Sequence, residues 1–111
     1  MKLTDLDPHW VKCTGDGHSQ IIEDMAAADG IVFLCPRCYE DNGGRVGTHI
    51  IFCWFQGKVP LSLLYCGPGR WNPSGTGYAD LTFVGPGLTS VLIQGGCNAH
   101  FHIVNGEIRH C

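Results

Sequence analysis

Apolar and polar side chains alternate on both sides of Asn105-Gly106 near the C-terminus. Asparagine and glycine both tolerate positive φ, so this pair predicts a two-residue type I′ turn between two strands. Counting outward from the turn places Val104 opposite Glu107 and Phe101 opposite His110. The core face of this hairpin then carries Phe101, Ile103, Ile108 and His110, and the polar face carries His100, His102, Val104, Glu107, Arg109 and Cys111.

Short apolar runs elsewhere in the chain predict further strands. Trp10 anchors a first strand near residues 8–11, and 31–34 reads as a buried strand. Ser19 is a plausible N-cap for a short helix over 20–28, which Asp29-Gly30 would end. The irregular stretch 67–77 predicts a long loop that faces a partner. The remaining predicted strands are 46–55, 59–65, 81–84 and 90–94.

Composition agrees with a small β-rich protein. The chain has 111 residues, of which 44% are hydrophobic and 15% charged, so it can form one core and is not a disordered polymer. Its 16 glycines and 6 prolines favour many turns between short strands. We therefore expect a single domain over residues 1–111, mainly β with a minor helical part: an antiparallel fold with one short helix and a C-terminal hairpin.

Net charge and hydropathy exclude several function classes. The net charge is −3 and no run is basic, which argues against nucleic acid as a partner. The first eight residues carry no apolar signal-peptide core, and no segment has the roughly 20 apolar residues of a membrane span. The expectation is a cytoplasmic protein with a protein partner. Seven cysteines are many for such a protein, and without a signal peptide they favour metal ligation or buried thiols over disulfides.

Two cysteine motifs have the spacing of metal ligands. Cys35-x-x-Cys38, at the end of the predicted strand 31–34, can direct two thiolates at one ion. Cys97-x-x-His100 offers a second pair at the same spacing, and together they form a Cys₃His set, a common closed structural zinc site. We predict that these four residues bind Zn²⁺, which stabilises a core this small.

Other assignments of these residues stay open. Cys35 and Cys38 could instead be a redox pair or two small buried residues, although the glycine-rich stretch after them does not suggest the helix that a redox motif needs. Cys111, opposite His100 in the hairpin, and His49 are reserve ligands. The remaining cysteines have no spaced partner and are interpreted as core thiols: Cys13, Cys53 and Cys66.

A catalytic site is less clearly indicated. His49 could act as a general base if a hydroxyl faces it, and Ser90 is one candidate hydroxyl among several that no sequence motif distinguishes. His102 reads better as a half-exposed strand histidine, and Asp80 could orient a base. The other candidate hydroxyls are Ser62, Ser74 and Thr89.

A set of motifs over roughly residues 30–110 resembles a small bacterial and phage family of domains of unknown function. Some members of that family belong to bacterial ubiquitin-like (Bub) operons and are serine peptidases that mature the ubiquitin-like precursor. The resemblance implies that the two cysteine motifs belong together. The motifs are Cys35-Pro-Arg-Cys38, His49, Trp71, Ser74-Gly75-Thr76, Asp80-Leu81-Thr82-Phe83, Gly85-Pro86-Gly87-Leu88 and Cys97-x-x-His100, followed by Ile103-x-Asn105-Gly106-Glu107-Ile108.

This chain departs from the family at the catalytic positions. The family nucleophile follows a proline that matches Pro86, and here that position is Gly87, which has no side chain. The family histidine before the cysteine motif would fall on Phe33. We therefore expect a zinc-stabilised, non-catalytic binding or accessory protein related to phage or prophage. The alternatives are a peptidase-like hydrolase with a relocated serine, Ser90, and His49 as base, or a structural phage component.

Overall fold

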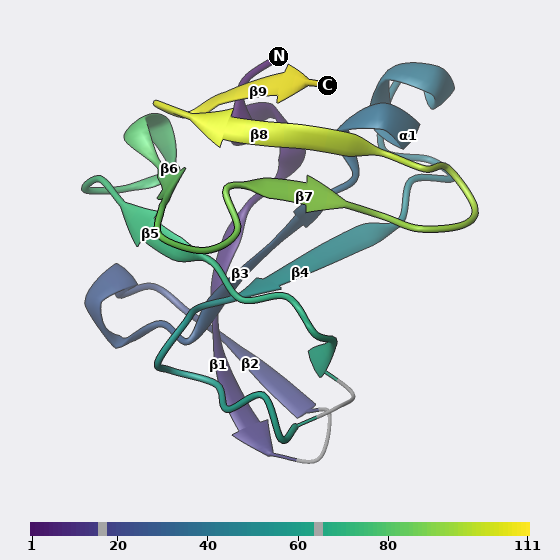
Figure 1. Cartoon of the computed structure of the whole chain (residues 1–111). Coiled ribbons are helices and arrows are strands. Elements are labelled where there is room, and N and C mark those ends of the chain that lie inside the picture. The colour runs from purple at the N-terminus through teal and green to yellow at the C-terminus, as the bar shows by residue number, and fades with distance from the viewer. Residues whose placement is uncertain (16–17, 64–65) are drawn as a thin grey trace.

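Three antiparallel sheets pack around one main core in the computed structural model, which describes residues 1–15, 18–63 and 66–111 (Figure 1). The largest sheet has four strands in the order β2-β1-β3-β4, so β2 and β4 are its edges. Its strands are β1 (His9–Gly15), β2 (His18–Ile22), β3 (Gly30–Leu34) and β4 (Ile50–Trp54).

Two smaller sheets come from the second half of the chain. β5 (Asn72–Ser74) pairs with β6 (Thr82–Val84), and the third sheet has the order β7-β8-β9, which leaves β7 as an edge. The strands of that sheet are β7 (Ser90–Leu92), β8 (His100–Val104) and β9 (Glu107–His110). The predicted fold class, mainly β with a minor helical part, is confirmed.

The single α-helix of the described residues, α1 (Pro36–Asn42), directly follows β3. Pro36 occupies its first turn, where a missing N–H costs nothing, and Gly43 ends it at φ 67°. None of the described helices has the length and apolar character needed to cross a lipid bilayer. The described residues also form the short 3₁₀ helices η1 (Leu3–Leu6), η2 (Met25–Ala27) and η4 (Tyr78–Asp80).

The predicted helix over 20–28 is wrong. Its first residues form β2, which pairs along β1 with Ile21 opposite Val11, and only Met25–Ala27 is helical. Cross-strand pairing outweighs the helix propensity of the alanine-rich end of this stretch, and the β-branched Ile21 and Ile22 near its start favour a strand.

Several strand boundaries also differ from the prediction. The strand expected over 46–55 is confined to β4, and 59–63 form turns, while 64–65 lie outside the described residues. The loop expected over 67–77 contains the short strand β5. Most of the expected core residues are buried, namely Trp10, Ile31, Phe33, Phe101, Ile103 and Ile108. His110, which the alternation placed on the core face of the hairpin, is exposed instead.

The C-terminal hairpin has the predicted register. Val104 faces Glu107 and Phe101 faces His110, across a turn in which Asn105 and Gly106 have φ values of 50° and 73°. The turn is docked into the core, because the Gly106 N–H donates to Leu81 O at 2.8 Å and Gly106 O accepts from Leu3 N–H at 2.8 Å. The hairpin thereby holds the N-terminal end of the chain.

Candidate metal centre

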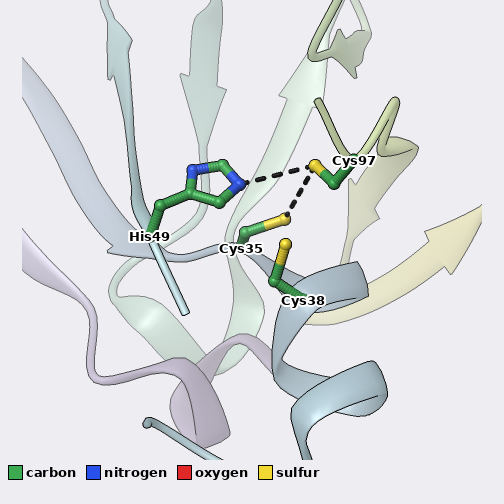
Figure 2. A group of neighbouring side chains, drawn as sticks. All are labelled: Cys35, Cys38, His49 and Cys97. Carbon is green, nitrogen blue, oxygen red and sulfur yellow. Dashed lines mark hydrogen bonds between the residues drawn. The ribbon is translucent and has the colours of Figure 1, made fainter. Parts of the chain in front are cut away.

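Three cysteines and one histidine from separate parts of the chain converge where β3 ends. Cys35, Cys38, His49 and Cys97 place their ligand atoms within 4.8 Å of one another (Figure 2). Cys35 and Cys38 come from the start of α1, His49 directly precedes β4, and Cys97 lies between β7 and β8. The group therefore connects the four-stranded sheet to the three-stranded sheet.

The spacing of the ligand atoms fits a tetrahedral ion. Zn–S bonds of about 2.3 Å and a Zn–N bond of about 2.0–2.1 Å at tetrahedral angles separate two sulfurs by about 3.8 Å and a sulfur from a nitrogen by about 3.6 Å. The Sγ atoms of Cys35 and Cys97 are 3.7 Å apart, and Nε2 of His49 is 3.4 Å from Sγ of Cys97. The four residues can hold a metal ion with little rearrangement.

Backbone N–H groups support the negative charge of two of the sulfurs. The N–H groups of Arg37 and Cys38, in the first turn of α1, donate to the sulfur of Cys35. The N–H of Ala99 donates to the sulfur of Cys97 in the same way. Each cysteine motif thus folds locally into a turn whose amides stabilise a thiolate.

The thiols differ in how readily they ionise without a cation. Burial raises the pKa of Cys35, and burial, followed by the neighbouring Cys35 and Cys97 sulfurs, raises the pKa of Cys38 to about 12. Burial also opposes ionisation of Cys97, but hydrogen bonds from His49 and from the Ala99 N–H bring its pKa down to about 7. Three thiolates this close repel one another, and a bound cation would compensate that repulsion.

His49 is oriented for ligation. Its Nδ1 lies 3.3 Å from the carbonyl oxygen of Ile50, which suits an N–H on Nδ1, and its Nε2 faces Sγ of Cys97 at 3.4 Å, where a metal ion would replace the proton that the two atoms share. A backbone carbonyl that fixes the other ring nitrogen is a common support for metal-binding histidines. His49 O also accepts from Cys35 N–H at 2.9 Å, which holds the two ligand segments together.

Three of the four residues predicted as ligands come together, and His100 does not join them. Ala99 and Phe101 are fully buried, so the alternation of β8 directs His100 outward, away from the cluster. His49 shares the parity of Ile51 and Cys53, the core-facing residues of β4, and so projects toward the core side. That parity is the signal in the sequence that favours His49 over His100. Cys111, the other reserve ligand, is exposed and pairs with His100 only through the backbone.

The residues considered for catalysis do not form a catalytic pair. His49 belongs to the cysteine cluster, whereas Ser90 lies on β7 opposite His102. Within the described part of the chain, no hydrogen bond joins a serine or threonine hydroxyl to a histidine ring. Asp80 accepts hydrogen bonds from Thr76 and Gly77 and so closes its own loop.

No pattern in the sequence indicates the groove that the folded chain forms. It has a volume of about 570 Å³ and runs between the edge strands β4 and β7, with walls that include Phe52, Trp71, Leu92 and His100. Part of the predicted partner-facing loop, Gly67 to Gly69, lines it as well. Phe52, Leu88 and Leu92 are 37%, 45% and 50% exposed along it.

No family model, no curated protein and no solved structure matches this chain. The geometry alone therefore supports the conclusion at this point: the protein is a small, β-rich domain with a Cys₃His cluster that can hold a metal ion.

Proposed function

We propose that this protein is a non-catalytic binding domain, stabilised by a structural Zn²⁺ ion, that accepts an extended segment of a protein partner in the groove between β4 and β7. The observation that mainly supports this proposal is the groove. The cluster supports the choice of metal, since three thiolates and an imidazole at tetrahedral spacing are typical of closed zinc sites. Four protein ligands leave no position for a reactive water.

The two walls of the groove are unpaired strand edges. β4 is the outer strand of one sheet and β7 the outer strand of another. No backbone hydrogen bond joins 50–53 to 90–92 in the part of the chain that the structure describes. Two edge carbonyls are already occupied, because Ser90 O accepts from the Trp71 indole N–H at 2.8 Å and Ile50 O lies 3.3 Å from Nδ1 of His49. The other N–H and C=O groups at such edges can pair with an added strand, a recurring mode of peptide recognition.

The width of the gap suits one strand. At one end Trp71 is bridged to Phe55 on one side and to Leu88 on the other. Neighbouring strands lie about 4.8 Å apart, so the two edges are separated there by about two such spacings, with Trp71 as a one-residue strand between them. At the other end His49 and Cys97 are in contact. The groove is thus bounded at both ends by the protein itself.

The chemistry of the walls selects an apolar partner. The described residues that line the groove include no aspartate, glutamate, lysine or arginine, and their large apolar side chains are Phe52, Trp71, Leu88 and Leu92. An uncharged segment with apolar side chains at alternate positions would bury these surfaces while its backbone pairs with β4 or β7.

Hydrolysis is the less favoured function. Both ring nitrogens of His49 are engaged, one with Ile50 O and one with Cys97, so His49 has no free site for a substrate proton. Phe33 is buried in the core, and Gly87 offers no nucleophile. Ser90 does line the groove, and in a binding domain its hydroxyl would serve as a hydrogen-bonding group.

A selection from a random library of displayed linear peptides tests the binding function. We expect enrichment of uncharged, apolar sequences, and we expect chemical-shift changes on binding to map to 50–53 and 90–92. Leu92→Asp should abolish binding, whereas Ile21→Asp, at a residue that is also exposed but lies on β2, should not. Methylating alternate backbone nitrogens of the peptide should weaken binding. Peptides that bind elsewhere, or that tolerate Leu92→Asp, would overturn the proposal.

A further inference from the structure

Two cysteines without a spaced partner in the sequence lie together in the folded protein. Cys13, in β1, and Cys66 both pack against a second, smaller core cluster made of Val11, Val32, Trp54 and Val59. Both are partly exposed, so small molecules can reach them. Neither belongs to the metal cluster, which lies beyond the opposite end of β3.

The Cys13 thiol is close enough to influence the ionisation of Cys66. Burial is the main cause that raises the pKa of Cys66, and the next causes are the charge of Cys13 and a hydrogen bond to it. Arg70 acts in the opposite direction, because its positive charge favours the thiolate of Cys66. The two side chains are near each other because both pack against the same four-residue cluster, and Arg70 is the cation that favours the thiolate of Cys66.

Both backbones are held in place. The N–H of Cys13 donates to a carboxylate oxygen of Asp29 at 2.9 Å. On the other side the buried guanidinium of Arg70 donates to the carbonyl oxygens of Gly67 and Gly69 at 2.7 and 2.6 Å, and to that of Cys66 at 3.5 Å. It also donates to Val59 O and Pro60 O, so the segments before and after residues 64–65 are both tied to one side chain.

We propose that Cys13 and Cys66 are a redox-active pair that forms a reversible disulfide beside the second core cluster. The co-reactant is a low-molecular-weight disulfide such as oxidised glutathione. One thiolate attacks a sulfur of that disulfide, forms a mixed disulfide and releases one small thiol. The second thiolate then attacks the protein sulfur of the mixed disulfide and releases the other small thiol. The protein loses two thiol protons and two electrons, and the small disulfide is reduced to two thiols.

The bond would affect the groove, because Cys66 and the residues that follow it to Gly69 form part of its wall. Joining Cys66 to β1 attaches that wall to the four-stranded sheet. The disulfide itself does not depend on the proposed binding function, so the two proposals can fail separately.

Peptide mapping of the zinc-loaded protein, incubated in glutathione buffers of increasing oxidised fraction, tests the pair. We expect one intramolecular disulfide that links the peptides containing Cys13 and Cys66, reversed by added reduced glutathione. Cys111→Ser should leave this bond unchanged, whereas Cys13→Ser and Cys66→Ser should each prevent it. The wild-type map alone decides the matter if a serine variant does not fold.

Two results would overturn the inference. In the first, Cys13 and Cys66 both remain open to alkylation across the whole buffer series while exposed Cys111 reacts. In the second, Cys66 links to a cysteine other than Cys13. Loss of peptide binding in the oxidised protein would connect the pair to the groove, whereas unchanged binding would leave the disulfide as a cross-link alone.

Discussion

The two cysteine sites lie at opposite ends of the four-stranded sheet and differ in what surrounds their sulfur atoms. At the end of β3, three thiols meet an imidazole and backbone N–H donors, an environment that suits a bound cation. Near the far end of β1, two thiols meet a buried guanidinium and apolar side chains, where a metal cation would be repelled. The groups that surround a cysteine, and not cysteine spacing alone, therefore favour either metal binding or disulfide chemistry.

Among the substitutions at the two sites, removal of a metal ligand should cause the largest loss of stability. Cys97→Ser should lose the bound metal and unfold most of the protein, because structural zinc contributes about 10–16 kcal/mol in small zinc domains, as much as the whole stability of a typical domain. Elemental analysis and thermal denaturation followed by circular dichroism would measure both. The matched control is Cys13→Ser, which should keep one zinc per chain. Equal metal content in Cys97→Ser and wild type would contradict the assignment.

Loss of the Arg70 side chain should be the next largest change. Arg70→Met leaves the buried carbonyl oxygen of Val59 and the half-buried ones of Gly67 and Gly69 without a donor, and we expect it to lower the free energy of unfolding by about 2–4 kcal/mol. Chemical denaturation measures this, and metal content should stay unchanged because Arg70 is remote from the cluster. Arg109→Met, at an exposed strand position, should change stability by less than about 0.5 kcal/mol. Similar effects of the two substitutions would show that the buried guanidinium does not anchor its loop.

The pH dependence of metal binding should show which thiols of the metal cluster are already ionised before metal binds. The thiols of Cys35 and Cys38 have raised pKa values, so both release a proton when metal binds at neutral pH, whereas Cys97, at about 7, is already partly ionised. We expect about three protons released per metal well below pH 7 and about two well above it, with metal affinity falling as pH falls. Calorimetry in buffers of different ionisation enthalpy measures the number of protons released per metal ion bound. A release that does not change between pH 6 and 8 would contradict the lowered pKa of Cys97.

The smallest effects should come from the residues left outside both sites. His100→Ala and Cys111→Ser should each change stability by less than about 0.5 kcal/mol and leave metal content unchanged, because both side chains are exposed. His49→Ala should lose the metal or bind it much more weakly. If His100→Ala instead removed the metal, the fourth ligand would be the one that the Cys-x-x-His spacing predicted.

Local patterns allowed part of this structure to be predicted. The Asn-Gly turn and the alternation around it predicted the register of the C-terminal hairpin, because the turn type defines which residues pair. The helix α1 was not predicted, although Pro36 and Gly43 mark its two ends, because the glycine-rich stretch after Cys38 did not suggest a helix. The helix expected over 20–28 failed because pairing with β1 is a long-range interaction that propensity does not report.

The sequence by itself determined the elements whose interactions are local: the hairpin, the buried strand β3 and the turn that directs Cys35 and Cys38 at one point. Tertiary structure alone decided which residues meet across long separations. It placed His49 rather than His100 beside Cys97, brought Cys66 to Cys13, and left β4 and β7 as facing edges. The physical reason is that strand parity and sheet order set the direction of each side chain, and sheet order results from packing of the whole core.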